Sequence, residues 1–342
     1  MKININARAI YIGILVCAAI LLAMIAYYAF APASDKEETQ YLLIDNDDNI
    51  DSVYHKLSQI APKRGVQTFR TMARHLHYDK HVRTGRYAVE KGDRAISLLR
   101  TLRNGQQTPM RLVIKEVRTI EDLAADLGTK LMADSTMIDN MLRDESCLNK
   151  YGLDSANIIT LFIPNTYEVY WDTAVGNLLD RMNKEKKRFW NDERKAKAAK
   201  LNMTAEQVMT LASIVDEETA NNAEKPVIAR LYYNRLNLHM PLQADPTVKY
   251  ASRQHDARRV RGKMLQADSP YNTYRHTGLP PGPIKIASVV GIDAVLNMPE
   301  HDYLYMCAKE DFSGTHNFAR THAEHQQNAA RYIAALNARG IK

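Results

Sequence analysis

Apolar residues follow three different patterns along this chain of 342 residues. Near the N-terminus, residues 10–31 form 22 consecutive positions without a charged side chain. A helix rises about 1.5 Å per residue, so this stretch is long enough to cross a hydrocarbon core of roughly 30 Å. Beyond it, short segments alternate between strand and helix periods. The pattern predicts one transmembrane helix over 10–31, followed by about 310 residues of folded chain.

The charges around the apolar stretch predict its orientation. Lys2 and Arg8 precede it, and acidic residues follow it from Asp35 onward. The positive-inside rule places residues 1–9 in the cytoplasm and the rest of the chain outside the cytoplasmic (inner) membrane, in the periplasm where there is one.

A cleaved signal peptide is the alternative. Residues 29–31 and 31–33 read Ala-Phe-Ala and Ala-Pro-Ala, which have the small-x-small form of a cleavage site. The apolar stretch is nevertheless longer than a typical signal-peptide core of about 7 to 15 residues. We therefore expect an uncleaved, single-pass anchor.

Residues 41–117 mix strand and helix patterns. Tyr87 and Val89 alternate with polar positions as in a strand, and Gly105 stands where a helix usually stops. The pattern predicts a small α+β module with strands at 41–45, 84–90 and 110–117 and helices at 49–60, 66–76 and 94–105.

A second unit begins near Thr119, where apolar residues recur at helical spacing from Ile120 onward. Farther along, residues 183–200 carry many charges of both signs, which predicts a solvated helix. We expect 118–342 to form one mixed α+β domain.

Composition excludes little. The formal net charge of +7 fits an anionic surface, polymer or lipid headgroup as neighbour, but the excess is spread over the chain. A nucleic-acid-binding protein needs a basic face interleaved with aromatic residues. No such face is evident in the sequence, so we expect no nucleic-acid partner. Cys17 lies in the apolar stretch, and a disulfide between Cys147 and Cys307 is left open for an oxidising compartment.

Residues 213–222, SIVDEETANN, place three carboxylates directly after an apolar turn. The preceding residues predict a helix that begins with the capping box of Thr204 and buries one apolar face. At about 100° per residue, Glu217 lies opposite that face, in solvent, whereas Asp216 and Glu218 flank it.

Glu218 is the better candidate for partial burial, because Ile214 widens the apolar face toward it. Lost hydration disfavours the charged carboxylate and raises its pKa, as a general acid near neutral pH requires, and a helix C-terminus acts in the same direction. Spacing alone leaves the alternative open: a solvated glutamate, or the partner of Arg230 or Arg235 on the next predicted helix.

Four blocks in order give the chain a family likeness: LASIVDEET, then NNAEKPVIARLYYNRLNLHMPLQADPTVKYA, SPYNTYRHTGLPPGPI and HNFARTHAEH. They resemble the membrane-anchored endolytic murein transglycosylases, the YceG-like or MltG family, over residues 119–342. More weakly, residues 41–117 resemble the LysM-like subdomain that this family carries before its catalytic part. The resemblance implies a membrane helix, a LysM-like α+β module and a YceG-like catalytic domain over 118–342.

The resemblance also implies an activity, a lytic cut at the MurNAc-GlcNAc β-1,4 bond of nascent peptidoglycan strands. In the family pattern S-I-x-E-x-E-T the second acidic position is catalytic, and here it is Glu218. The first is Asp216, which departs from the pattern.

Most glycosidases use two carboxylates. A lytic transglycosylase instead uses the sugar's own C6 hydroxyl as nucleophile and leaves a 1,6-anhydroMurNAc end. Glu218 would protonate the leaving oxygen and then, as carboxylate, take the proton of that hydroxyl. No cofactor or metal is implied.

Further residues in the matching blocks are candidates for orienting the sugar by hydrogen bonds or stacking. They are Gln243, Asp245, Tyr271, Asn272, Tyr274 and His316. For each, the alternative is a turn or core contact. The prolines in 278–284 predict a rigid turn that shapes one wall of the groove.

Two further positions depart from the family. Asn165 stands where the family usually has Asp, and residues 283–288 lack the usual Pro-Gly after the Gly-Pro-Ile block. Both make rate and substrate preference harder to infer.

A zinc hydrolase is a weaker interpretation, suggested by His316, His322 and His325 with Glu324. The spacing H-A-E-H is one residue shorter than the H-x-x-E-H zinc motif, so we expect no metal site.

The expected partners are peptidoglycan strands and, as candidates, the cell-wall synthases known as penicillin-binding proteins. The alternative from another class is a non-catalytic, membrane-anchored scaffold that binds peptidoglycan and recruits those synthases.

Overall fold

The computed structural model describes residues 7–257 and 260–340, and the chain divides into two compact units. The first comprises Met1–Arg111 and Glu168–Thr173, and the second Leu112–Tyr167 and Ala174–Lys342. The boundaries fall inside β3 (Met110–Val113) and β4 (Thr166–Val169). Both units combine helices with short strands and are mostly helical, so the α+β expectation is confirmed at that level. Most of the predicted cytoplasmic N-terminus, residues 1–6, lies outside the described residues.

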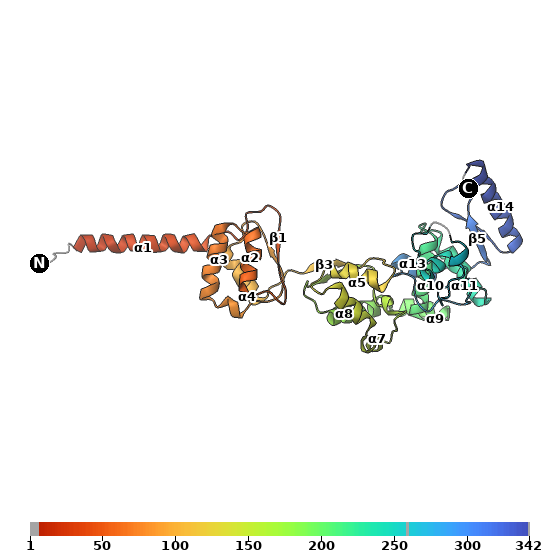
Figure 1. Ribbon diagram of the computed structural model, residues 1–342, viewed down its shortest axis with the longest axis horizontal. Helices are drawn as coiled ribbons and strands as arrows, with labels where there is room; N and C mark the ends of the chain where they lie inside the picture. Colours follow the sequence, from red (N-terminus) through yellow and green to blue (C-terminus); the bar gives the residue numbers. More distant parts are fainter. Residues whose placement is uncertain (1–6, 258–259, 341–342) are drawn as a thin grey trace. The chain divides into compact units, whose positions relative to one another are not determined.

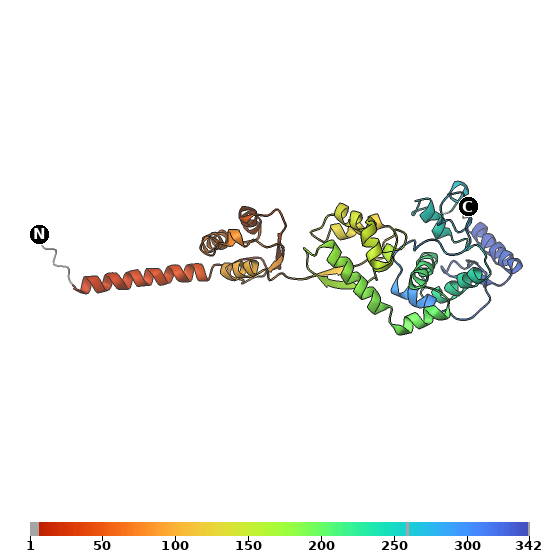
Figure 2. The same cartoon turned by 90° about the horizontal axis from the view of Figure 1, so that it is seen from below.

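The apolar stretch forms helix α1 (Ala7–Ala29), which extends away from the rest of the first unit (Figures 1 and 2). Ile10–Ala29 has a mean hydropathy of 2.6 over its most apolar part, and none of that part is buried. Its 20 residues would span about 30 Å. The helix ends two residues before the predicted limit, because Ala31 is fully buried in the core of the module that follows.

That module contains most of the predicted elements within a few residues. Strands β1 and β2 pair antiparallel, from Gln40 opposite Val89 to Ile44 opposite Gly85. Tyr87 and Val89 on β2 point into the core, as their alternation predicted, and Leu42 and Ile44 on β1 are buried there too. The elements are β1 (Gln40–Ile44), α2 (Ile50–Ile60), α3 (Lys63–His75), η1 (Tyr78–Lys80), β2 (Gly85–Val89) and α4 (Ala95–Asn104), which ends at Gly105 in a left-handed conformation. The predicted strand 110–117 is shorter, ending at Val113.

The end of α1 is fixed directly to this module. The amide of Ala33 donates to the Asp93 carbonyl at 2.7 Å, and the amide of Ala95 donates to the Ala31 carbonyl at 2.9 Å. Gly65 approaches so closely that a Cβ there would lie 2.0 Å from the Pro32 carbonyl oxygen. The residues just after the apolar helix are therefore part of a folded core.

The second unit begins with short helices. The side chain of Thr119 caps the first of them by accepting the amide of Asp122 at 3.0 Å. These helices are α5 (Ile120–Gly128), α6 (Ser135–Arg143), α7 (Glu145–Tyr151) and η2 (Ile158–Leu161). Cys147 and Cys307, both among the described residues, are free thiols, so the disulfide left open by the sequence does not form.

The prediction of one solvated helix over 183–200 is wrong. The segment contains the end of α8 (Val175–Phe189) and all of α9 (Asp192–Lys200), separated at Trp190, which is only 3% exposed. Lys186 is also buried, and its ammonium donates to Thr160 Oγ1 at 3.0 Å and to Glu206 at 2.7 Å. The buried indole of Trp190 lies where the helix is interrupted, and the charge pattern of the segment did not predict this break.

Helix α10 (Ala205–Glu218) is the centre of this unit. It begins with the predicted capping box of Thr204 and Gln207. Every residue from Val208 to Val215 is buried, so the helix is covered on all sides rather than on one face. Around it pack α11 (Lys225–Asn237), α12 (Asp245–Ala251) and α13 (Val289–Leu296) (Figure 1).

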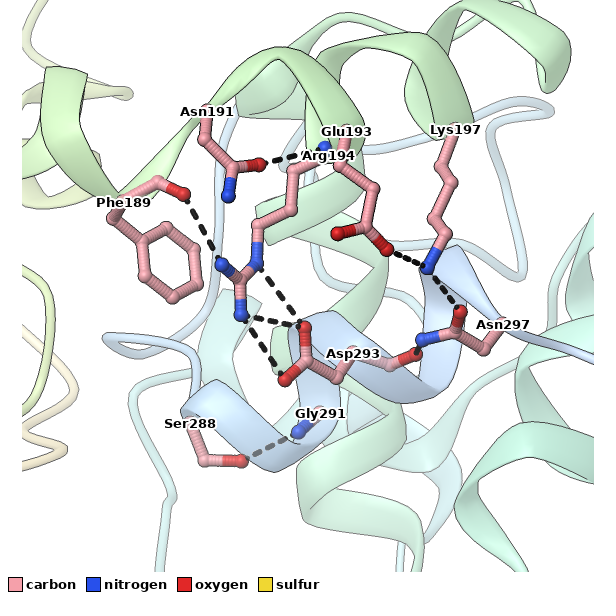
Figure 3. A network of polar contacts seen from close by, with 9 residues as sticks. All are labelled: Phe189, Asn191, Glu193, Arg194, Lys197, Ser288, Gly291, Asp293 and Asn297. Atoms are coloured by element: carbon pink, nitrogen blue, oxygen red, sulfur yellow. Dashed lines mark hydrogen bonds and ion pairs between the residues drawn. The ribbon is translucent and has the colours of Figure 1, made fainter.

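A polar cluster joins α9 to α13 (Figure 3). The guanidinium of Arg194 bonds the carboxylate of Asp293 through three contacts of 3.1–3.3 Å and also reaches the Phe189 carbonyl. One turn on, Lys197 bonds Asn297 at 2.8 Å. These contacts fix α13 from outside while its inner face packs against α10.

The C-terminal part of the unit is a hairpin followed by a long helix. Strands β5 (Tyr305–Ala308) and β6 (His316–Ala319) pair antiparallel, with Ala308 opposite His316. Helix α14 (His322–Ala338) packs on both strands. A single 3-10 turn, η3 (Gly262–Met264), lies in the preceding loop region.

The turn at 278–284 packs against the chain around Ala156. A Cβ on Gly282 would lie 2.1 Å from the Ala156 carbonyl oxygen, whereas a Cβ on Gly176 in α8 would meet nothing within 4 Å. Glycine is thus required at 282 by close approach of two backbones.

We predict that G282A destabilises the second unit by about 1–3 kcal/mol, because overpacking must displace one of the two segments. The matched control G176A places the same methyl group in open space and should leave stability unchanged or raise it slightly, because alanine favours a helix. Thermal unfolding of the full chain in detergent measures both. Equal midpoints for G282A and wild type would contradict the close approach.

Candidate active site

The three carboxylates at the end of α10 have three different environments. The first, Asp216, has a side chain only 2% exposed. It accepts the amide and the hydroxyl of Ser288, each at 2.8 Å, and the ammonium of Lys225 at 2.7 Å. Asp216 therefore joins α10 to the start of α11 and to the N-cap of α13, and its oxygens are occupied by the fold.

The second carboxylate, Glu217, is paired rather than solvated, so the prediction that it lies in solvent is wrong. It accepts Arg118 at 2.5 Å and Lys285 at 3.2 Å, and its side chain is 20% exposed. Burial alone would raise the pKa of Glu217, but the two cations outweigh burial and hold the pKa below its ordinary value. A permanently ionised Glu217 is unsuited to give up a proton near pH 7.

The third carboxylate, Glu218, forms no ion pair within the described part of the chain, although the charge of Lys249 acts to lower its pKa. Its Oε1 accepts a hydrogen bond from the Tyr232 hydroxyl at 2.6 Å. Burial raises the pKa of Glu218 from 4.5 to about 7, the hydrogen bond from Tyr232 opposes that rise, and the charge of Asp245 adds to it. Of Glu217 and Glu218, only Glu218 can hold and release a proton near neutral pH.

Glu218 lines a cavity of about 400 Å³. Helices α10 and α11, the segment 242–245, Tyr274 and the β5–β6 hairpin with the start of α14 all contribute to its wall. Five of the seven residues proposed from the sequence meet here: Glu218, Gln243, Asp245, Tyr274 and His316. They come from segments almost 100 residues apart, so the fold brings the separated sequence blocks to one place.

Asn272 does not line this cavity. It is fully buried, and its amide donates to the carbonyls of Leu265 and Ala267, each at 2.9 Å. Its Oδ1 accepts the amide of Tyr274, whose hydroxyl donates to Asp245 at 2.6 Å. Asn272 thus shapes the loop that presents Tyr274.

Tyr271 lies elsewhere too. It lines a separate cleft of about 850 Å³ together with Tyr250, whose ring centroid is 4.8 Å away. Neither Tyr271 nor Asn272 is therefore placed to contact a ligand in the Glu218 cavity.

Sequence reasoning missed Tyr232 and gave Arg235 only as a possible ion-pair partner of Glu218. Arg235 is buried, and its guanidinium donates to three backbone carbonyls and, at 3.4 Å, to Gln243 Oε1. Burial lowers the pKa of Arg235 from its ordinary value. Both residues lie three apart on α11, and the signal that could have found them is this pair of polar side chains on a helix face that packs toward α10.

Gln243 has an unusual backbone. Its φ is +50°, in the left-handed region that non-glycine residues rarely occupy. Its amide donates to the Thr273 carbonyl at 3.1 Å, which holds the segment against the loop before Tyr274. Such conformations cost about 1–3 kcal/mol and gather at ligand sites, which fits its position at the cavity.

The histidines have other partners than a metal. Glu324 accepts the amides of Arg320 and Thr321 at 2.9 and 3.2 Å and so caps α14. His322 and His325 lie against the ring of Tyr305, at 5.7 and 5.5 Å between centroids. In residues 7–257 and 260–340, no three of the His, Cys, Asp and Glu side chains are grouped to hold a metal ion.

Together these groups give the cavity a definite chemistry. A carboxyl with a pKa of about 7 is half protonated at neutral pH, so it can donate a proton and then accept one. Around it lie a carboxylate, an amide, a guanidinium and the aromatic ring of Tyr305, which together can hydrogen-bond and stack a polar, uncharged ring such as a sugar.

Comparison with known proteins fits this arrangement. The family model of the YceG-like family matches residues 42–331, so the chain belongs to the YceG-like family. Two relatives named endolytic murein transglycosylase are each 30% identical: one from Bacillus subtilis (strain 168) over 269 residues, 74% of each chain, and one from Streptococcus pneumoniae serotype 2 over 183 residues, 50% of this chain and 31% of that protein. A crystal structure of a YceG-like protein from Listeria monocytogenes has the same fold, with a TM-score of 0.55 at 24% identity, covering 85% of this chain and 99% of that one.

We predict that E218Q stabilises the protein above pH 7. The folded state holds the proton of Glu218 up to a pKa of about 7, against 4.5 for an ordinary glutamate, so this group's contribution to the free energy of unfolding falls as pH rises through that window. The difference between E218Q and wild type should grow from near zero at pH 4 to at most about 3 kcal/mol at pH 8.

E217Q is the matched control, because it makes the same change one residue earlier. The pKa of Glu217 is lowered, so its ionised form stabilises the fold at neutral pH and E217Q should be destabilised there. Thermal unfolding of both variants between pH 4 and pH 8 tests the assignment. Opposite signs for the two variants at pH 8 are expected, and an E218Q variant less stable than wild type at that pH would show that Glu218 is not a strained, proton-holding group.

Proposed function

We propose that this protein is an endolytic peptidoglycan lytic transglycosylase. It cleaves the MurNAc-GlcNAc β-1,4 bond within nascent glycan strands and so ends their elongation. The observation that carries the proposal is the pKa of about 7 at Glu218 in a cavity with sugar-binding chemistry, in a chain of the YceG-like family. Relatives named endolytic murein transglycosylase support the same reaction.

In the proposed reaction Glu218 begins protonated. Its proton passes to the bridging oxygen as the C1–O bond breaks, and the C6 hydroxyl of the same MurNAc attacks C1 to form the 1,6-anhydro ring. The carboxylate left on Glu218 can accept the proton that the hydroxyl releases, which restores the acid. No water is consumed.

The other cavity residues supply charge and orientation. Asp245 brings a negative charge close enough to raise the pKa of Glu218, and that charge would favour the positive character that develops at C1. Tyr274 holds Asp245, and Arg235 and Gln243 provide donors for sugar hydroxyl or N-acetyl oxygens. These side chains would fix the saccharide against Glu218.

The N-terminal parts fit an enzyme that works at the membrane. Helix α1 would serve as a single-pass anchor in the cytoplasmic membrane with the N-terminus inside, and the module of the first unit would be a LysM-like glycan-binding element. Cell-wall synthases that produce the strands are the proposed neighbours. An apolar, exposed helix and the charges on either side of it support this arrangement.

We expect E218Q to abolish strand cleavage, with a loss of about 100-fold to 10,000-fold, because the amide keeps size and hydrogen bonding but carries no acidic proton. Full-length protein in detergent is incubated with purified glycan strands, and products are identified by mass spectrometry. Anhydro ends are lighter by one water than hydrolysed ends. E217Q again serves as the neighbouring control and should retain more activity than E218Q.

Two outcomes would overturn this assignment. If E218Q cleaved strands at the wild-type rate, Glu218 would have no part in the chemistry. A wild-type protein that binds strands without cutting them would instead favour the membrane-anchored scaffold.

The pH dependence provides an independent test. Only the protonated form of Glu218 is active, so kcat/KM should fall as pH rises through about 7. The Tyr232 hydroxyl stabilises the carboxylate, and Y232F should therefore raise the pKa of Glu218 and shift the alkaline limb upward by about one pH unit. A limb that moves downward, or does not move, would contradict the role given to this hydrogen bond.

A further inference from the structure

A second ionisable group, the imidazole of His316, borders the same cavity and is fixed by two hydrogen bonds to one residue. His316, the first residue of β6, binds both oxygens of Glu224. Its amide donates to Oε1 at 2.8 Å, and its ring Nδ1 lies 3.1 Å from Oε2. Backbone and side chain of one residue are thus fixed by one carboxylate.

The partner determines which ring nitrogen carries a proton. A carboxylate oxygen only accepts, so Nδ1 must be the donor in this contact. In the neutral ring Nε2 is then an acceptor, and it has no hydrogen-bond partner among the described residues. The side chain is 17% exposed, and it is a wall residue of the cavity that contains Glu218.

Glu224 also connects His316 to the end of helix α10, which carries Glu218. It is the N-cap residue of α11, and its Oε2 accepts the hydroxyl of Thr219 at 3.3 Å. Thr219 directly follows Glu218, and Tyr232 farther along α11 holds the Glu218 carboxyl. One helix therefore positions both the carboxyl and the imidazole.

We propose that His316, oriented by Glu224, is the base that takes the proton of the attacking C6 hydroxyl, while Glu218 protonates the leaving oxygen. This rests on the proposed function and assigns its second proton transfer to a different group. The C6–O to C1 bond forms as the C1–O bridge breaks, the hydroxyl proton moves to Nε2, and the Glu218 proton moves to the bridging oxygen. Transfer of the proton from His316 to Glu218, directly or through solvent, restores both groups, so no co-reactant is needed.

The arrangement has the parts that a base of this kind requires. The carboxylate fixes the tautomer and ring orientation and stabilises the imidazolium that forms, as in other histidine bases oriented by an acid. Besides Glu218, the charged groups and the other histidines that line the cavity are Asp245, Arg235, His322 and His325, and its further titratable groups are Tyr232, Tyr274, Tyr305 and Cys307. His322 and His325 lie against Tyr305, and the described residues show no carboxylate bonded to either ring.

The key variant is H316N. The asparagine amide can occupy the position of Nδ1 and still donate to Glu224, but nothing replaces Nε2. We expect H316N to keep the thermal midpoint of wild type and to lose about 100-fold or more in kcat, as removal of a general base does. We also expect a larger share of hydrolysed ends, because an unactivated C6 hydroxyl competes less well with water.

Three further variants separate the possible results. E224Q tests the positioning residue and should lower kcat more than it raises KM. H239N makes the same substitution at an exposed residue with φ of +53°, which asparagine tolerates, and should behave as wild type. E218Q reports on the proposed function itself.

If H316N retains wild-type kcat and product ratio while E218Q is inactive, the histidine is structural and this inference fails alone. If wild type makes no anhydro product, the proposed function fails first. If H316N unfolds, H316Q, which offers an amide near Nε2, must also lose kcat for the base role to stand, and recovery of wild-type kcat in H316Q would overturn it.

Discussion

The chemistry of this protein depends on the burial of the middle of helix α10, where every residue from Val208 to Val215 is covered. This packing leaves little water for the three carboxylates at the end of the helix, and each takes a partner within the fold. Asp216 and Glu217 are bonded by cations, and Glu218 is bonded by a tyrosine hydroxyl. A hydroxyl only partly replaces lost hydration, and this difference in partner gives Glu218 a raised pKa while the pKa of Glu217 is lowered.

Helix α11 supplies most of the control over that carboxyl. From its first turn Lys225 neutralises Asp216, and from its middle Tyr232 bonds Glu218. Arg235, one turn later, is held by backbone carbonyls of the segments that carry Gln243 and Tyr305. A single rigid element therefore sets the relative positions of the cavity walls, which suits a site whose residues come from distant parts of the chain.

The sequence predicted what local rules determine and missed what packing determines. The capping box at Thr204 and the left-handed stop at Gly105 depend on near neighbours, and both are confirmed. The helical wheel favoured Glu218 over Asp216 for burial, yet the Asp216 side chain is only 2% exposed. It also misplaced Glu217, because Arg118 and Lys285 approach that carboxylate from segments far away in the chain. Burial is decided by the sum of all neighbours, which one helix does not contain.

The candidate site was predictable to a similar depth. Five of the seven residues proposed from the family motifs line one cavity. Such motifs indicate which segments of the chain belong to the same site. They did not distinguish Asn272, whose amide supports a loop, from Tyr274, which that loop presents. Both have polar side chains in the same short block, and only the direction of each side chain separates them.

The way α1 enters the first unit has a consequence for processing. Ala31 and Ala33 are both small and both buried, and their backbones bond the segment 93–95. A peptidase that cut after either alanine would remove part of the buried core of the module along with the apolar helix. A released form of this protein would therefore begin with an incomplete first unit, so the module is complete only while it stays joined to helix α1.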